Sequence, residues 1–251
     1  MNTTIDGIVL RARALEGDRL LHILTAELGL ITAYANRTGT MRSKMAASTE
    51  ALSYSRFVLF THRGRVSVDK ADSNQIFFGV RADFAKLCLA SYFAQLAGEL
   101  LTAGESADEP LRLLLNCLHI LEESKREPAQ LKPIFELRLL TLAGFMPDLV
   151  GCRFCAEYNG EDMIFFPREG ELSCGPCLQE EGVPKSGGVS VSAGVLAAMR
   201  HIIYAPAERL FSFTLGDDGL RALSWISEQY LLTRAERSFP ALEMYKSAIV
   251  N

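Results

Sequence analysis

Residues 5–36 read IDGIVLRARALEGDRLLHILTAELGLITAYAN, and they decide the fold of the first part of the chain. They contain three runs rich in Ile, Val, Leu and Tyr, at residues 5–11, 20–25 and 30–36, with turn-forming residues between the runs. This pattern is typical of short β-strands. Gly29 lies between the second and third runs, as a tight connection requires. The stretch therefore predicts three consecutive strands.

Two further runs of the same kind follow at residues 53–60 and 64–70. His62, Arg63 and Gly64 separate these runs in the manner of a hairpin loop. Five short strands within the first 80 residues fit a small closed barrel or a sandwich. Residues 1–80 are therefore expected to form a β-rich domain.

The pattern changes near residue 81, where apolar residues begin to recur at the period of a helix. Helices are predicted at residues 83–101, 110–121, 133–143, 192–204, 217–232 and 240–249, with polar connectors at 105–109 and 125–130. Residues 151–183 interrupt this pattern with two CxxC pairs and a hairpin-like stretch, FFPREGEL. The expected class is α+β, with an α-helical domain at residues 81–251 that carries the cysteine-rich insert.

Composition and charge describe a globular chain whose two parts differ. Of the 251 residues, 49% are hydrophobic and 22% are charged, which is not a disordered composition. Residues 1–80 hold ten Lys/Arg against seven Asp/Glu, and the rest hold sixteen against twenty-three, so the balances are +3 and −7. We find no targeting segment and no stretch long enough to span a membrane, so a cytoplasmic location is expected. Thiols stay reduced in that compartment, so paired cysteines favour a metal over a disulfide.

The strongest local signal is a pair of CxxC motifs. Cys152 and Cys155 form the first, Cys174 and Cys177 form the second, and eighteen residues separate the two motifs. This spacing is typical of a zinc site in which four thiolates surround one ion. Gly175 and Pro176 suit the tight backbone of the second motif. Four protein ligands leave no open position for water or substrate, so the site is expected to be structural.

Other interpretations of the cysteines stay open. One CxxC pair could be a thioredoxin-like redox pair, although no βαβ pattern surrounds either pair. Four thiolates also accept an iron–sulfur cluster, although the regular double spacing favours zinc. The four thiols could be unligated, which leaves their clustering without a packing reason. Cys88 and Cys117 lie on apolar helix faces and are expected in the core.

A search for catalytic motifs is negative. The chain has no GxxxxGK[ST], HExxH or GxSxG motif, and no GxGxxG motif after a strand. Its four histidines are scattered, and its adjacent carboxylates point apart on a helix. We therefore expect no enzyme and no small-molecule substrate. A zinc-dependent hydrolase would need an open metal position, which four cysteines do not leave.

The β-rich head carries a basic, hydroxyl-rich loop between two predicted strands, at residues 37–44. Such a loop can follow a phosphate backbone, because Lys and Arg release counterions on contact. Aromatic residues on the flanking strands could stack on the bases of single-stranded DNA. Phe57 is expected in the core, while Tyr34 and Tyr54 are left open between core and surface.

These pieces, in this order, resemble the RecO family of bacterial recombination-mediator proteins over nearly the whole chain. The resemblance rests on DGIVLRARALEGDRLLHILTAELGLITAYA, SYSRFVLF, LASYFAQLAGELL, FELRLLTLAGFMPDLVGCRFC and GELSCGPC. It implies an N-terminal oligonucleotide-binding (OB) fold at residues 1–80, followed by a helical domain with a zinc finger.

The resemblance also implies a role and partners. The role is to bind single- and double-stranded DNA without catalysis, to anneal strands, and to help load RecA onto DNA coated with single-strand-binding protein. The implied partners are RecR and the C-terminal tail of single-strand-binding protein, at the nucleoid. The DNA face would comprise Arg11, Arg37, Arg42, Lys44, Arg56, Arg63 and Arg65. The alternative is a zinc-stabilised protein–protein adaptor whose DNA contact is incidental, as the acidic balance of residues 81–251 suggests.

Overall fold

The computed structural model describes residues 2–36 and 45–250. The chain forms two compact units, the first made of Met1–Lys125 and Phe239–Asn251 and the second of Arg126–Ser238. The last segment of the chain thus returns to the first unit.

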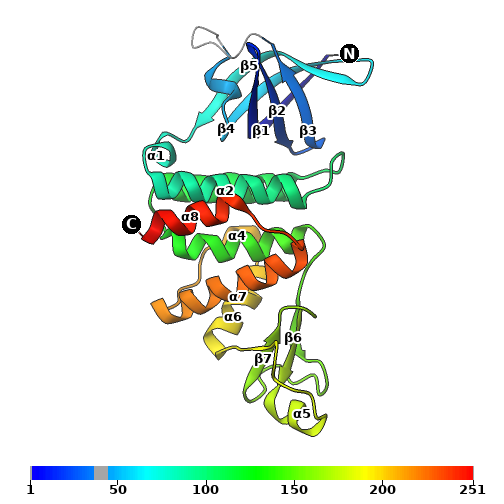
Figure 1. Cartoon of the computed structure of the whole chain (residues 1–251), viewed down its shortest axis with the longest axis vertical. Coiled ribbons are helices and arrows are strands. Elements are labelled where there is room, and N and C mark those ends of the chain that lie inside the picture. Colours follow the sequence, from blue (N-terminus) through cyan, green and yellow to red (C-terminus); the bar gives the residue numbers. More distant parts are fainter. Residues whose placement is uncertain (1, 37–44, 251) are drawn as a thin grey trace. The chain divides into compact units, whose positions relative to one another are not determined.

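The first unit begins with a closed barrel, shown at the top of Figure 1. Its strands are β1 (Asn2–Leu15), β2 (Asp18–Thr25), β3 (Gly29–Ala35), β4 (Ser53–His62) and β5 (Arg65–Ile76), and a short 3₁₀ helix, η1 (Ala47–Thr49), precedes β4. The strand order around the barrel is β1-β2-β3-β5-β4, in which β3 and β5 close the ring by parallel pairing. The predicted five-stranded OB barrel is confirmed.

Alternating side chains fill the barrel. Val9, Ile23 and Phe57 are completely buried in its core, which confirms the expectation for Phe57. The turn between β4 and β5 has positive φ at Arg63 (48°) and Gly64 (78°), as a tight hairpin requires. Gly29 has a φ of 60°, and a Cβ there would lie 2.0 Å from the carbonyl oxygen of Glu105. Only glycine fits that position, because the backbone of a later loop lies against it.

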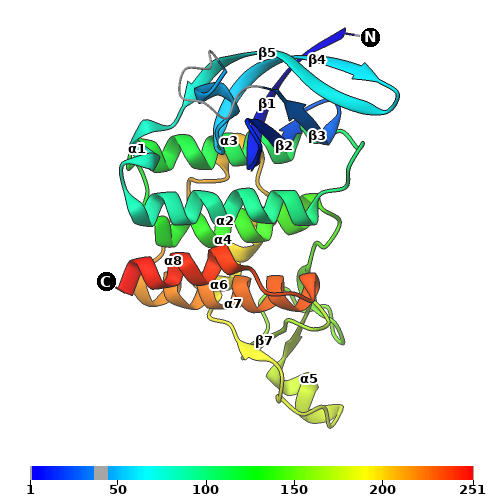
Figure 2. The same cartoon turned by 45° about the horizontal axis from the view of Figure 1, so that its top comes forward.

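Four helices complete the described part of the first unit: α1 (Phe78–Arg81), α2 (Phe84–Leu100), α3 (Asp108–Glu122) and α8 (Pro240–Val250). Asp83 caps α2, since its carboxylate accepts the amide of Lys86 at 3.0 Å. Figure 2 shows α2 between the barrel and α8. The Ala241 amide donates to the Gln95 side chain at 3.2 Å, which fastens the start of α8 to α2. The last segment therefore packs on the helix nearest the barrel.

The second unit combines three long helices with a small sheet. The helices are α4 (Pro128–Leu142), α6 (Ala193–Tyr204) and α7 (Asp217–Ala235), with a short 3₁₀ helix, η2 (Ala207–Arg209), between α6 and α7. The sheet has the order β6-β8-β7-β9. Its elements are β6 (Asp148–Cys152), β7 (Met163–Phe166), β8 (Glu171–Cys174) and β9 (Val189–Ser190), and α5 (Gly175–Glu180) follows β8. Helices on both sides of the cysteine-rich insert pack together, because α4 contacts both α6 and α7.

Helix α4 begins five residues before its predicted start at Pro133. The segment before Pro133 was expected to be a polar connector, but Pro128 occupies the first turn, where proline is tolerated. Gln130 is buried there, and its amide donates to the Phe213 carbonyl at 2.9 Å. The polar residue thus belongs to the helix because tertiary packing supplies its hydrogen-bond partner.

Buried charge links α4 to α7. The Lys132 ammonium lies 2.9 Å from Glu136 Oε1 and 3.0 Å from Glu228 Oε2. The side chains of Lys132 and Glu136 are only 4% and 0% exposed. Ser227 Oγ donates to Glu136 Oε2 at 2.5 Å. The three charges are therefore paired and hydrogen-bonded where two helices meet.

Candidate metal centre and nucleic-acid interface

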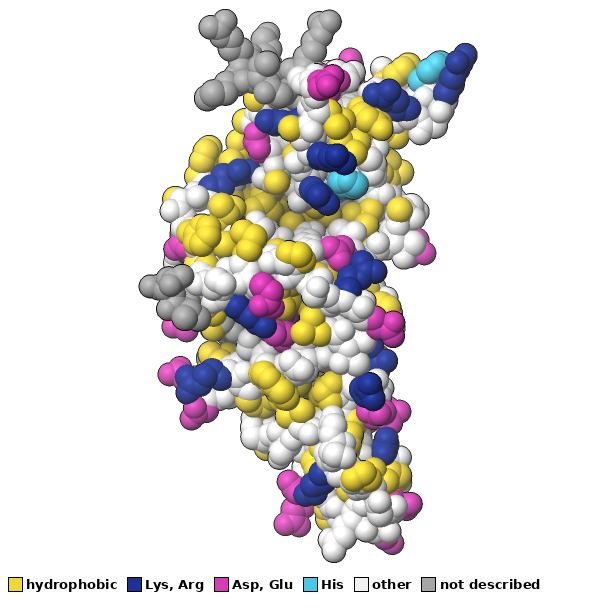
Figure 3. Space-filling model, in the orientation of Figure 1, with side chains coloured by type: hydrophobic (Ala, Val, Ile, Leu, Met, Phe, Trp, Pro, Cys, Tyr) yellow, Lys and Arg dark blue, Asp and Glu magenta, His cyan; other side chains and the backbone are white. Residues whose placement is uncertain are grey.

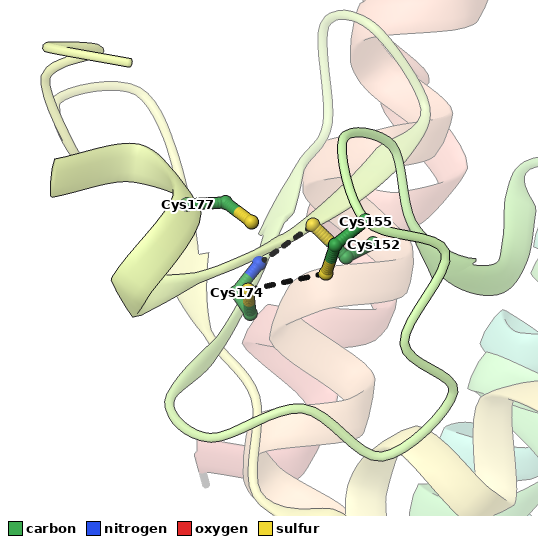
Figure 4. A group of neighbouring side chains, drawn as sticks. All are labelled: Cys152, Cys155, Cys174 and Cys177. Carbon is green, nitrogen blue, oxygen red and sulfur yellow. Dashed lines mark hydrogen bonds between the residues drawn. The ribbon is translucent and has the colours of Figure 1, made fainter. Parts of the chain in front are cut away.

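The four cysteines of the CxxC motifs come together at one end of the small sheet (Figure 4). Strands β6 and β8 pair in parallel, which brings the ends of both strands to the same side. Cys152 ends β6 and Cys155 lies in the following turn, while Cys174 ends β8 and Cys177 lies in α5. All four Sγ atoms lie within 4.8 Å of one another. The arrangement brings every predicted ligand into one cluster.

The sulfur geometry fits a tetrahedral metal ion. Cys155 Sγ lies 3.8 Å from Cys174 Sγ. Four sulfurs at about 2.3 Å from a central zinc are separated from one another by about 3.8 Å. A covalent disulfide needs about 2.05 Å between sulfurs, so the observed spacing suits ligands around an ion. The cluster could hold a metal ion with four thiolates and no open position.

Backbone amides lower the pKa of Cys152 and so favour its thiolate form. Burial alone would raise the pKa of the Cys152 thiol, but the amides of Cys155, Cys174 and Phe154 act against burial and lower this pKa to about 6. The Cys174 amide lies 3.3 Å from Cys152 Sγ. Hydrogen bonds with Cys174 and Cys155 raise the pKa of Cys177. Without a metal, Cys152 thus favours the thiolate while Cys177 favours the protonated thiol. A bound cation would favour the thiolate at both, since bound metal displaces the protons of its thiol ligands.

Close contacts explain why a glycine, Gly175, stands in the second CxxC motif. A Cβ on Gly175 would lie 2.9 Å from Asp162 Oδ2, in the loop before β7. Gly175 also donates its amide to the carbonyl oxygens of Glu161 (3.1 Å) and Asp162 (3.0 Å). The prediction that this residue permits a tight backbone turn is thus explained by a close approach of two chain segments.

One arginine fastens the residues on either side of the first CxxC motif to α6, and sequence reasoning missed it. The buried guanidinium of Arg200 donates to the carbonyl oxygens of Leu149 (2.7 Å), Val150 (3.3 Å) and Tyr158 (2.6 Å), and to the side chain of Asn159 (3.1 Å). It also lies 3.6 Å from the centroid of the Tyr158 ring. The only sequence signal is an arginine among apolar residues on a helix that follows the insert.

Replacing Arg200 by alanine is expected to destabilise the second unit by about 3 kcal/mol, because the four hydrogen bonds of a buried guanidinium would be lost. The midpoint of urea unfolding should fall accordingly. Arg221→Ala is the matched control, since the Arg221 side chain is 72% exposed and pairs with Asp218 on its own helix. Equal midpoints for the two variants would show that Arg200 does not hold the motif in place.

The predicted DNA-contact residues divide into three groups. Arg11, Arg63 and Arg65 are exposed on the barrel, and Arg65 lies 3.9 Å from the centroid of the Tyr34 ring. Arg56 is also exposed, but it is paired. Arg37, Arg42 and Lys44 lie outside the described residues. Three predicted contacts are therefore exposed without an acidic partner among the described residues.

Arg56 differs from the other barrel arginines because Asp6 neutralises it. Its guanidinium lies 2.9 and 3.0 Å from the two carboxylate oxygens of Asp6, and Asn74 donates to the same carboxylate at 3.1 Å. The hydrogen bond from Arg56 holds the pKa of Asp6 below its usual value. Strand pairing places the two residues opposite each other, at Asp6↔Arg56 in β1 and β4.

Aromatic side chains also line the β4–β5 hairpin. The rings of Phe60 and His62 stack with centroids 6.2 Å apart and planes 8° apart. Phe60 is 43% exposed, whereas Tyr34 and Tyr54 are half-buried. An exposed aromatic and a neighbouring cation are the groups that contact single strands without reading sequence.

No helix in the described part of the chain is long and apolar enough to cross a membrane.

A family model described as "Recombination protein O N terminal" matches residues 1–77, and one described as "Recombination protein O C terminal" matches residues 81–243. A protein of Acetivibrio thermocellus named "DNA repair protein RecO" is 28% identical over 232 residues, covering 92% of this chain and 91% of that protein. Proteins of the same name from Symbiobacterium thermophilum and Anaeromyxobacter dehalogenans are 30% and 31% identical over 244 residues, covering 95% and 94% of this chain and 94% of each relative.

Proposed function

The chain belongs to the RecO family of DNA repair proteins, and from that premise we propose that it is a non-catalytic recombination mediator that binds single- and double-stranded DNA. In this role it anneals complementary strands and helps load RecA onto DNA covered by single-strand-binding protein. The observation that supports DNA contact most directly is an OB barrel with arginines exposed on its surface.

The proposed DNA contact lies on the barrel, within residues 1–80. Arg11, Arg63 and Arg65 supply charge there, together with the basic segment at residues 37–44. Arg56 is proposed to contribute least, because Asp6 already balances its charge. Each arginine that meets a phosphate releases counterions, so the affinity should fall as salt is added.

Replacing Arg63 by glutamine is expected to weaken binding of single-stranded DNA by about three- to tenfold and to lower the salt slope by about 0.7, the value for one phosphate contact. Arg56→Gln is the matched control on the same hairpin, and it should change the affinity by less than about twofold, since it removes only an exposed ion pair. Fluorescence anisotropy at several salt concentrations measures both quantities. A larger loss with Arg56→Gln than with Arg63→Gln would contradict the proposed face.

For the metal centre we propose one structural zinc held by Cys152, Cys155, Cys174 and Cys177. The donor set supports zinc because four thiolates at tetrahedral spacing satisfy it completely. Elemental analysis of the purified chain should give about one zinc per molecule. Iron together with a visible absorption band would instead identify an iron–sulfur cluster.

The proposed partners beyond DNA are RecR and the acidic C-terminal tail of single-strand-binding protein, in the cytoplasm at the nucleoid. A second candidate function follows from the charge of residues 81–251, whose balance is −7. In that account, the helical domain is a zinc-stabilised adaptor and DNA contact is incidental. Pull-down of the protein partners with and without DNA tests the adaptor account, in which DNA should make no difference to the partners captured. A strand-annealing assay tests the mediator account, in which annealing should need the DNA-binding residues.

A further inference from the structure

The first unit contains a pocket of about 620 Å³ between the barrel and α2. Residues of β1, β2 and β3 form one wall, and residues of α2 with Pro240 at the start of α8 form the other. This volume lies within the range of about 300–1,000 Å³ that is typical of small-ligand sites. Figure 3 shows basic side chains over the barrel and hydrophobic side chains along the strip between the barrel and α2.

Small side chains on α2 create the hollow. Ser91, Ala94 and Gly98 line the pocket, and their spacings of three and four residues place them on one helix face. A Cβ added at Gly98 would meet only Leu10 Cδ1, at 3.6 Å. Larger residues at these positions would fill part of this space. The small residues of α2 therefore leave room on the helix side of the pocket.

The two walls carry opposite charge. Arg11 and His22 face each other in the β1–β2 ladder and both line the barrel wall. Among the described residues, the Arg11 guanidinium has no hydrogen-bond or ion-pair partner. On the helix wall, Glu99 accepts the Gln95 amide at 2.7 Å. An anionic group thus suits the barrel wall, and a hydrogen-bond donor suits the helix wall.

We propose that this pocket holds one unstacked nucleotide of a bound single strand. The proposal rests on the proposed DNA-binding function and names a subsite of that face. The phosphate lies on Arg11 and His22, the base lies against apolar residues such as Leu10 and Leu30, and Glu99 accepts from an amino group at the base edge. A paired base cannot enter with its partner strand attached, so the pocket favours single strands or extruded bases.

The test uses a short single-stranded oligonucleotide with 2-aminopurine at one position, moved along the strand between samples. The emission of 2-aminopurine is quenched by stacking and rises when the base leaves the stack. With the wild-type chain we expect emission to rise several-fold at one or two adjacent positions. Gly98→Leu should abolish the rise even at protein concentrations where anisotropy shows the oligonucleotide to be fully bound, because a leucine side chain would fill the pocket. Gly98→Ala, which adds one methyl group, should keep it.

Ser91→Met provides a second way to fill the pocket if Gly98→Leu does not fold, since Ser91 is exposed at the other end of the same wall. Circular dichroism melting checks each variant. If the wild-type chain binds the oligonucleotide but emission rises at no position, or if the rise survives a folded filling variant, the nucleotide pocket is wrong and the DNA-binding function stands. If the wild-type chain does not bind the oligonucleotide at all, the proposed function itself fails.

Discussion

Replacing Cys174 by serine is expected to abolish stoichiometric metal binding and to destabilise the second unit by more than about 4 kcal/mol. The reason is that Cys174 takes part in both the metal site and the sheet. Its Sγ lies 3.8 Å from Cys155 Sγ, and its amide donates to Cys152 Sγ. Cys174 also pairs with Met163 in the β7–β8 ladder. Loss of one thiolate leaves three charged or polar sulfurs without an ion. Strands β6 to β9 and α5 should lose their order together.

Cys88→Ala is the matched control for this change. Cys88 is a buried thiol in α2, outside the metal cluster, and its loss removes only a small packed group. It should keep about one zinc per chain and cost about 1 kcal/mol. Elemental analysis and urea unfolding measure the two effects. Full zinc content in Cys174→Ser, or equal stability of the two variants, would contradict a structural four-thiolate centre.

Replacing Lys132 by methionine is expected to destabilise the second unit by about 3–5 kcal/mol, which is the usual cost of removing one partner from a buried ion pair. Methionine keeps most of the side-chain volume, so the loss reflects charge and not a cavity. Glu136 is fully buried and would face Glu228 with no cation between them. The double variant Lys132→Met/Glu136→Gln should recover part of the loss, because it removes one of the two stranded charges.

Lys125→Met is the control for the buried network. Lys125 is 61% exposed and pairs with the surface residue Glu123, so its replacement should cost less than about 1 kcal/mol. Urea midpoints of the three variants and the wild type give the comparison. A Lys132→Met midpoint equal to that of Lys125→Met would mean that the buried charges do not hold α4 to α7.

Much of the fold could be predicted from residues close together in the chain. The five strands follow from short apolar runs with turn residues between them, and the hairpin at Arg63 and Gly64 follows from turn chemistry. The start of α4 could not be predicted, because Gln130 looks like a connector residue until its partner Phe213, far along the chain, is known. Local patterns give element types, while distant partners decide some boundaries.

The candidate sites show the same division. The four cysteines could be identified because metal-binding chemistry requires a short, regular spacing, and the structure brings them within 4.8 Å. Arg200 could not be identified, since its carbonyl partners depend on how the insert folds back on α6. The same holds for Arg56, which counts as a basic residue in sequence but is balanced by Asp6 across a strand pair. Charge counts cannot tell free arginines from paired ones.

The proposed metal centre and the proposed DNA face lie in different compact units. The cysteines belong to residues 126–238, and the barrel belongs to the unit that contains residues 1–125. Zinc loss should therefore lower the stability of the second unit and leave the basic residues of the barrel in place. In this account the metal has a structural role, and the exposed arginines form the surface that contacts DNA.

The most direct test of this account is a titration of single-stranded DNA at several salt concentrations. It compares the wild-type chain with a variant in which Arg11, Arg37, Arg42, Lys44, Arg63 and Arg65 are all glutamine. We expect the logarithm of the wild-type affinity to fall linearly with the logarithm of salt, with about 0.7 of slope for each phosphate contacted, and we expect the variant to lose most of both affinity and slope. Unmeasurable binding by the wild-type chain at low salt, or an unchanged affinity and slope in the variant, would contradict the proposed DNA face.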